Sequence, residues 1–279
     1  MLYSRIAMKL QFNHNMMKVK GFISSSHKYI VCFMLFMSAM HSVKSVNANE
    51  NETIKAAERE LKEFSLDLGM SRIVYNPDAK GATLPVLNRH GYPILVQSEV
   101  LSENYDKSHN FVVTPPLFRL DPHQSNRIRI IRVGGEFPED RESLKWVCVK
   151  GIPPKHGDKW VETQKNNIDK NISTLQIQVS ITNCVKLFVR PNSIKGRPDS
   201  MAQLITWQRK GNKLQGTNPT PFYMNISDLI FGDKRLDKTD YIAPFSTSEY
   251  EVPAGTSGKV KWRVITDYGG KSKLFEYDI

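Results

Sequence analysis

The stretch TLQIQVSITNCVKLFVRP, residues 174–191, alternates apolar and polar side chains in the manner of a β-strand. Its apolar positions are every second residue, Leu175, Ile177, Val179 and Ile181. Successive side chains of a strand point to opposite faces, so this period of two gives one apolar and one polar face. The stretch then continues into Cys184, Lys186 and Arg190. We ask which surface the apolar face covers, and why it leads to a cysteine and a lysine.

Residues 1–48 differ in composition from the rest and have the pattern of a secretory signal peptide. They contain six lysine or arginine residues and no acidic residue, together with the apolar run YIVCFMLFMSAM (29–40) and the small residues SVNA (45–48). The apolar run is shorter than the roughly 20 residues that a membrane-spanning helix needs. We therefore expect cleavage after Ala48, export, and no membrane insertion.

The net charge of the chain changes when this leader is removed. The whole sequence carries +11, and the loss of the six cations of residues 1–48 leaves +5. More than half of the net positive charge therefore lies in the expected leader, and the case for a nucleic-acid partner is weak. We expect no nucleic acid to bind.

Two cysteines remain after the leader is removed, Cys148 and Cys184, because Cys32 lies in the apolar run. In an exported protein such a pair is most simply one disulfide, which in the chain-entropy treatment contributes roughly 4 kcal/mol for a loop of this length. A metal pair or a nucleophile are the alternatives, but neither has evident partners. The histidines of the mature chain are scattered over loop-like sequence, at His90, His109, His123 and His156.

Short apolar runs between turn residues predict an all-β fold of antiparallel sandwiches. The clearest of these runs are residues 71–75, 83–88, 93–101, 126–133 and 144–152. Residues 52–64, ETIKAAERELKEF, are rich in helix formers and suggest a tail or a short helix. The proline-containing segment 191–200 has no apolar period and suggests a linker. Beyond it, a hairpin through RKGN (209–212) is expected.

No catalytic or metal-binding motif is present in the sequence. The patterns G-x-S-x-G, H-E-x-x-H, G-x-x-x-x-G-K-[ST] and C-x-x-C are all missing. Each of these motifs places a nucleophile, a metal or a phosphate, and no other pairing of residues replaces them by spacing alone. We therefore expect no enzymatic activity, no cofactor and no metal.

The stretch FPEDRESLKWVCVKGIPP, residues 137–154, resembles the signature of the PapD-like periplasmic chaperones of pilus assembly. The stretches SRIVY (71–75), TPPLFRLDP (114–122) and KLFVRP (186–191) are similar to that family in the same order. The resemblance implies two immunoglobulin-like domains set at an angle, with a cleft between them. We place them at residues 49–192 and 193–279. The cysteines flank a long connection from about 153 to 172, which resembles the long-loop branch that serves capsule-like or afimbrial surface fibres.

The same resemblance implies a function in the periplasm. Such chaperones bind fibre subunits that lack their last strand, fill the gap with a strand of their own, and deliver the subunits to an outer-membrane usher. The matching donor residues here are Leu175, Ile177 and Val179, and Ser173 departs from the apolar residue usual at the next position. Arg72 and Lys186 match the basic pair that grips the carboxylate of the subunit's C-terminus.

Two further sets of residues match the family. Glu142, Arg190 and Asp267 correspond to its charged trio, which we expect to fix the angle between the domains. A second alternating stripe predicts a supporting first strand that also contacts the subunit, formed by Phe64, Leu66 and Leu68. An exposed apolar edge also favours self-association of the free protein. The alternative function is an exported immunoglobulin-like adhesin or binding module, in which the alternating strand is core.

Overall fold

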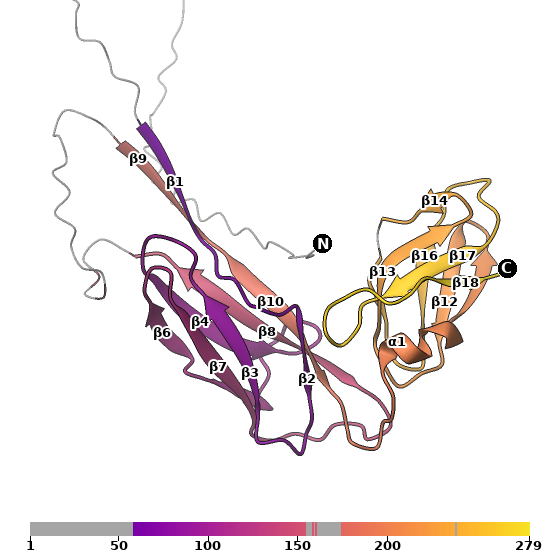
Figure 1. Cartoon of the computed structure of the whole chain (residues 1–279), viewed down its shortest axis with the longest axis horizontal. Helices are drawn as coiled ribbons and strands as arrows, with labels where there is room; N and C mark the ends of the chain where they lie inside the picture. Colours follow the sequence, from indigo (N-terminus) through magenta and orange to yellow (C-terminus); the bar gives the residue numbers. More distant parts are fainter. Residues whose placement is uncertain (1–57, 155–157, 159, 161–173, 238) are drawn as a thin grey trace, which may run out of the picture.

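The chain folds into two β-sandwich domains joined at an angle (Figure 1). The computed structural model describes residues 58–154, 158, 160, 174–237 and 239–279. The expected signal peptide, residues 1–48, lies outside this part of the chain. Within the described ranges, no helix combines the length and the apolar character that a membrane crossing requires. The same residues contain no group of three or more histidine, cysteine or acidic side chains placed to hold a metal ion.

All five strands predicted by range in the N-terminal domain are present. Each bound lies within one residue of its expected position, in β2 (Arg72–Tyr75), β3 (Ala82–Leu87), β4 (Ile94–Leu101), β7 (Ser125–Arg132) and β8 (Ser143–Ile152). The other strands of this sandwich are β5 (Phe111–Thr114), β6 (Leu117–Leu120) and β10 (Thr182–Val189). One sheet has the order β2-β10-β8-β4-β6 and the other β3-β7-β5.

The period of two explains the core of this domain. Inward-facing residues such as Val96, Ile128, Val147 and Leu187 are fully buried between the two sheets. Each fully buried branched side chain stabilises the fold by roughly 1.5–3 kcal/mol relative to leaving it exposed. Polar neighbours on the same strands face outward, so each sheet has one solvent-exposed face and one buried face.

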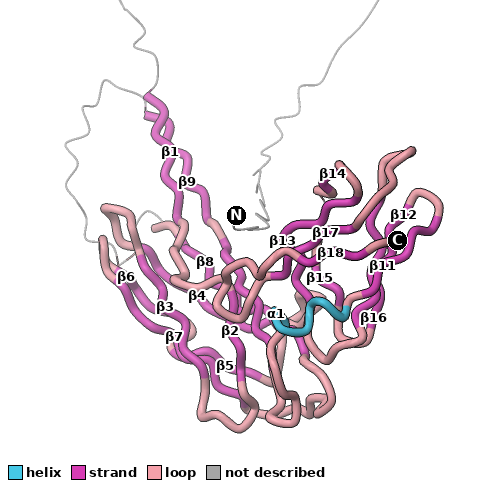
Figure 2. The backbone as a smooth tube through the Cα atoms, turned by 45° about the vertical axis from the view of Figure 1, so that its right-hand side comes forward, coloured by secondary structure: helices cyan, strands magenta, loops and turns pink. Residues whose placement is uncertain are grey.

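Beyond the sandwich, two strands form a separate parallel ribbon, β1 (Glu58–Phe64) with β9 (Thr174–Ser180). Figures 1 and 2 show this ribbon extending away from the sheets of the N-terminal domain. The helix suggested for residues 52–64 is therefore wrong over 58–64, while residues 52–57 lie outside the described part. Backbone pairing with β9 overrides the helical propensity of this segment, because propensity is a weaker contribution than a complete ladder of hydrogen bonds.

The C-terminal domain begins after a short helical turn, α1 (Pro198–Met201), followed by a 3-10 turn, Ala202–Leu204. Its first sheet has the order β11-β12-β16, in β11 (Thr206–Lys210), β12 (Lys213–Asn218) and β16 (Ser246–Glu251). The expected hairpin is the β11–β12 connection. The second sheet contains β13 (Met224–Phe231), β14 (Lys234–Arg235), β15 (Tyr241–Ile242), β17 (Val260–Val264) and β18 (Phe275–Tyr277). Trp207 of β11 and Trp262 of β17 pack in the core of the C-terminal domain, with their ring centroids 5.5 Å apart.

A small third core joins the two domains. Leu144 of β8 and Phe188 of β10 pack with Tyr223, which precedes β13, and all three are buried. Trp146 and Tyr241 cover this cluster from either side of the junction. Apolar contact across the junction therefore helps to hold one domain against the other.

Gly151 marks the point where the β1–β9 ribbon leaves the sandwich. Its N–H donates to the carbonyl of Ile181 (3.0 Å), and the N–H of Ile181 donates to the carbonyl of Phe64 (3.3 Å). The hydroxyl of Ser180 donates to the carbonyl of Gly151 (2.6 Å). A Cβ atom at position 151 would overlap the carbonyl group of Phe64. The close approach of these backbones therefore requires glycine.

Replacing Gly151 with alanine is expected to lower the free energy of unfolding by about 1–3 kcal/mol, because the backbone of Phe64 must move to make room. Urea unfolding followed by fluorescence measures the change. Gly91→Ala is the matched control, because a Cβ atom there meets nothing within 4 Å. Equal stability of the two variants would contradict this account of the ribbon's base.

Candidate functional site

Arg72 and Lys186 lie directly beside each other on neighbouring strands. β2 and β10 pair in parallel, and the register places Lys186 opposite Arg72. Residues opposite each other in a parallel pair present their side chains to the same face. Both side chains also reach the C-terminal domain, where Arg72 Nη1 donates to the carbonyl of Ile265 (3.3 Å) and Lys186 Nζ donates to Asn225 Oδ1 (2.6 Å). The two predicted anchor residues therefore meet at the junction of the domains.

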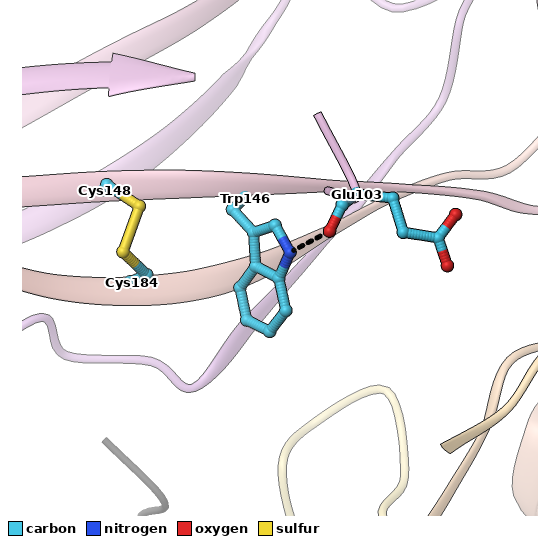
Figure 3. The surroundings of a disulfide bond; sticks show 4 residues. All are labelled: Glu103, Trp146, Cys148 and Cys184. Carbon is cyan, nitrogen blue, oxygen red and sulfur yellow. Dashed lines mark hydrogen bonds between the residues drawn. A yellow bond between two sulfur atoms is a disulfide. The ribbon is translucent and has the colours of Figure 1, made fainter. Parts of the chain in front are cut away.

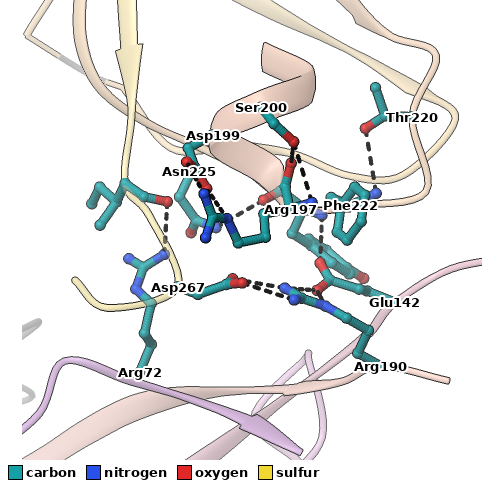
Figure 4. Close-up of polar contacts among 12 residues, drawn as sticks. Arg72, Glu142, Arg190, Arg197, Asp199, Ser200, Thr220, Phe222, Asn225 and Asp267 are labelled. Carbon is teal, nitrogen blue, oxygen red and sulfur yellow. Dashed lines mark hydrogen bonds and ion pairs between the residues drawn. The ribbon is translucent and has the colours of Figure 1, made fainter. Parts of the chain in front are cut away.

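The Arg72 side chain is held in a poorly solvated position. The residue is 8% exposed, and its Nε has no hydrogen-bond acceptor among the described residues. Burial lowers the pKa of the Arg72 guanidinium to about 10, although the negative charges of Asp267 and Glu142 act to raise it. Figure 4 shows the guanidinium near Asp267 without a direct link between them. A buried cation with spare donor capacity favours the arrival of an anion.

Lys186 is surrounded by groups from both domains. Its ammonium lies 4.6 Å from the ring centroid of Tyr241 and 5.6 Å from that of Trp146. It also lies 3.6 Å from Asp240 Oδ1, in addition to its bond with Asn225. The side chain is 18% exposed. Rings and oxygens of this kind stabilise a cation in a fixed place.

Glu103 of the N-terminal domain binds two tyrosines of the C-terminal domain near Lys186. Its carboxylate accepts hydrogen bonds from the hydroxyls of Tyr241 (2.8 Å) and Tyr223 (3.2 Å). Trp146 Nε1 donates to the backbone carbonyl of Glu103 at 3.2 Å (Figure 3). Burial raises the pKa of both tyrosine hydroxyls, and the nearby Glu103 carboxylate adds to that shift. The hydroxyls therefore remain donors, and they connect Tyr223 and strand β15, which begins at Tyr241, to the N-terminal domain.

The predicted charged trio is one hydrogen-bonded cluster (Figure 4). Arg190 Nε donates to Glu142 Oε1 at 2.7 Å, and its Nη1 and Nη2 donate to the two oxygens of Asp267 at 2.8 and 2.7 Å. Glu142 Oε2 accepts from the backbone N–H of Tyr223 (2.8 Å). Burial raises the pKa of the Glu142 carboxyl, while the positive charge of Arg190 acts to lower it. The cluster connects Glu142 and Arg190 of the first domain to Asp267 and Tyr223 of the second.

The predicted disulfide is confirmed between Cys148 and Cys184 (Figure 3). The two residues are direct partners on the antiparallel strands β8 and β10. The link ties β10 to the middle of the sheet just after β9 ends. It therefore fixes the base from which the ribbon extends.

The apolar stripe of the predicted donor strand is open to solvent. Ile177 is 45% exposed and Val179 is half-buried, while the side chain of Leu175 and all of Ser173 lie outside the described residues. Leu61 of β1 pairs in register with Ile177 and is 62% exposed. Both residues lie on one face of the ribbon, so the exposed stripe is wider than the sequence of β9 alone indicates.

The stripe of Phe64, Leu66 and Leu68 requires a correction. All three side chains are buried in the core of the N-terminal domain, with exposures of 1–8%. The strand beside β9 is instead β1, which ends at Phe64. Side chains enclosed in this way have no surface left for a subunit, and the exposed apolar residue of β1 is Leu61.

Sequence reasoning missed the surroundings of Lys186. Asn225, Asp240 and Tyr241 lie roughly 40–55 residues away in sequence, and no local spacing connects them to β10. Trp146 has a signal in the sequence, because it is the aromatic residue that lies two positions before Cys148 in the stretch 137–154.

Comparison with known families agrees with this architecture over both domains. Residues 65–195 match the N-terminal domain of PapD, described for pili and flagellar-assembly chaperones. Residues 200–276 match the C-terminal domain of the pili assembly chaperone PapD. The chain belongs to the PapD family of pilus assembly chaperones. Members of this family are chaperones and not enzymes, and the alternative of an adhesin is not favoured.

Individual relatives of this chaperone carry matching descriptions. The chaperone protein AggD of Escherichia coli is 52% identical over 225 residues, which cover 81% of this chain and 89% of AggD. The chaperone protein caf1M of Yersinia pestis is 47% identical, covering 78% and 87% of the two chains.

Solved structures of relatives have the same fold. The Escherichia coli chaperone DraB is 55% identical with a TM-score of 0.70, over 80% of this chain and all of DraB. A Salmonella enterica complex of the SafA pilin with the SafB chaperone matches at 41% identity and a TM-score of 0.71, over 80% of this chain and all of the matched one.

The trio makes a specific prediction for the domain junction. Arg190→Ala is expected to lower the free energy of unfolding by about 3–5 kcal/mol, because it leaves the buried Glu142 without its cation. Denaturant unfolding measures this loss, and small-angle X-ray scattering is expected to show a wider range of interdomain angles.

Lys213→Ala is the matched control for Arg190→Ala. Lys213 pairs with Glu249 at 2.7 Å on an exposed face of the C-terminal domain. An exposed ion pair contributes little to stability. A loss at Arg190 no greater than the loss at Lys213 would show that the trio does not hold the junction.

Proposed function

We propose that this chaperone binds fibre subunits in the periplasm by lending them β9 as an edge strand, and passes them to an outer-membrane usher. The support comes from the open edge and open face of the ribbon. In the described part of the chain, β9 pairs by its backbone with β1 alone. A strand with a vacant edge and an exposed apolar face is suited to complete another sheet by strand addition.

The apolar stripe supplies the binding energy in this proposal. Each branched side chain removed from water gains roughly 1.5–3 kcal/mol, before the cost of ordering the partner. Leu175, Ile177 and Val179 together therefore contribute about 5–9 kcal/mol, and Leu61 adds to the same face. A subunit whose own core lacks a strand offers the matching apolar groove.

The observation that carries the proposal is the register of Arg72 with Lys186. Two cations held side by side on parallel strands, one of them buried with an unused donor, suit the two oxygens of a carboxylate. The C-terminal carboxylate of a subunit is the group that we assign to this pair. The anchor lies on β10, directly downstream of β9, so it sets where the pairing begins.

We further propose that the client is a thin, capsule-like or afimbrial fibre. The support is the disulfide across β8 and β10 at the two ends of a long connection, together with the extended first strand β1. A long first strand widens the surface that the ribbon presents to a subunit.

Removing the anchor cations is expected to weaken subunit binding. Lys186→Ala, alone or with Arg72→Ala, is expected to cost on the order of 3–5 kcal/mol of binding, because a half-buried carboxylate loses its counter-charge. The measurement is the yield of soluble complex after co-expression with a fimbrial subunit that the unaltered chaperone holds. Lys150→Ala removes an equal charge at an exposed position of β8 and is the control. Unchanged capture by a folded Lys186→Ala variant would refute the anchor.

A charge on the apolar stripe is expected to abolish capture without unfolding the chaperone. Ile177→Asp places a carboxylate where the subunit's apolar groove must close, at a cost of several kcal/mol. The side chain is 45% exposed in the free protein, so the unfolding free energy is expected to change by about 0.5 kcal/mol or less. Gln178→Asp places the same group on the opposite face of β9 as a control. If Ile177→Asp instead unfolds the protein, Ile177 belongs to the core and the strand is not a donor.

A further inference from the structure

The anchor lysine already faces a carboxylate of its own chain. Asp240 Oδ1 lies 3.6 Å from Lys186 Nζ, across the junction of the domains. Asp240 directly precedes β15, whose first residue, Tyr241, stacks its ring against the same ammonium at 4.6 Å. The position that a client's carboxylate requires therefore has an acidic neighbour built into the C-terminal domain.

We propose that Asp240 holds the place of the client's carboxylate in the free chaperone and competes with it. The inference rests on the proposed function of Lys186 as an anchor, and it adds a residue that sets the affinity and selectivity of that site. Asp240 balances one of two adjacent cations until a client arrives. The client's carboxylate then replaces Asp240 as the partner of the ammonium.

Local bonds fix Asp240 in this position. Its Oδ1 accepts a hydrogen bond from the backbone N–H of Tyr241 (2.9 Å), and its carbonyl accepts one from the N–H of Ile226 (3.2 Å). Tyr241 is itself tied to Glu103 of the N-terminal domain. The carboxylate is therefore presented to Lys186 by a segment that is braced from both domains.

The contact between Asp240 and Lys186 is weak enough to be displaced. The distance of 3.6 Å is beyond a good hydrogen bond, and the Asp240 side chain is 67% exposed. Exposed pairs of this kind contribute little to stability. Asn225, which accepts from Lys186 at 2.6 Å, and the two rings hold the ammonium in place. Removal of the Asp240 charge therefore leaves the lysine where it is.

The charge of Asp240 acts on an incoming anion through repulsion. Two unit charges about 5 Å apart in water repel enough to change an affinity by about fourfold, and more where water is partly excluded. A small anion gains only its contacts with the two cations, so this repulsion weakens its binding. A subunit that also pairs with β9 has further binding energy to overcome it. Selectivity of this kind comes from a built-in unfavourable contact.

The test uses acetate as a minimal carboxylate and acetamide as its uncharged analogue. Binding is followed by NMR of the lysine Cε–Hε groups in the full chaperone, with the Lys186 signal assigned by Lys186→Arg. Asp240→Asn is compared with Asp233→Asn, which removes an exposed charge that pairs with Lys234 beyond the opposite end of β13. Asp240→Glu keeps the charge and serves as a second control.

We expect Asp240→Asn to bind acetate at Lys186 about fourfold or more tightly, with a difference that shrinks as salt is added. Asp233→Asn and Asp240→Glu are expected to match the unaltered protein, and acetamide is expected to leave the signal unmoved. Equal or weaker acetate binding by Asp240→Asn, while the unaltered protein responds at Lys186, would overturn the role of Asp240 and leave the anchor standing. Absence of any acetate response at Lys186 in every variant would overturn the anchor itself, and the inference with it.

Discussion

The parallel pairing of β2 with β10 is the constraint on which the rest of the structure depends. Its register places Lys186 beside Arg72, and the ladder continues where the N–H of Arg190 donates to the carbonyl of Tyr75 at 2.8 Å. On its other edge β10 pairs with β8, where the disulfide to Cys148 lies. Upstream, only Ile181 separates β10 from β9. One continuous stretch of chain therefore carries the exposed apolar face, one cysteine of the disulfide, the lysine of the cationic pair and the junction arginine.

The strands and the disulfide could be predicted from the sequence because their signals are local. A period of two is visible within eight residues, and two cysteines in an exported chain leave few alternatives. The bounds of β3, β4, β7 and β8 were accordingly expected to within one residue. The trio of Glu142, Arg190 and Asp267 came from resemblance alone, since residues 77 positions apart give no local sign of contact.

The errors share one physical cause, which is that tertiary contacts outweigh local preference. Residues 58–64 favour a helix by composition, but the backbone of β9 offers them a full parallel ladder. Phe64, Leu66 and Leu68 have the alternation of an exposed stripe, yet they enter the core because the chain bends into the sandwich after Phe64. An alternating pattern shows that one face is apolar, and only packing decides whether a partner or the domain itself covers that face.

Burial of charge at the junction has a cost that apolar packing there would avoid. The carboxyl of Glu142 has a raised pKa, so its ionised form is held in place at some expense, and replacing such clusters by apolar residues is often neutral or stabilising. Fixed hydrogen bonds, unlike apolar contacts, specify one geometry. Arg190 donates to carboxylates of both domains in one plane, so the cluster resists rotation of one domain against the other.

In the proposed function, that fixed geometry matters because the anchor and the donor strand act on one client together. Ile177 lies nine residues before Lys186, about 30 Å along an extended chain. A slip of one residue in the pairing would turn every apolar side chain of β9 away from the client's core. On this proposal, a carboxylate bound at Lys186 fixes the register of that pairing, because Asn225 and Tyr241 of the second domain hold the ammonium in place. The position of the second domain therefore takes part in setting the register between the client and β9.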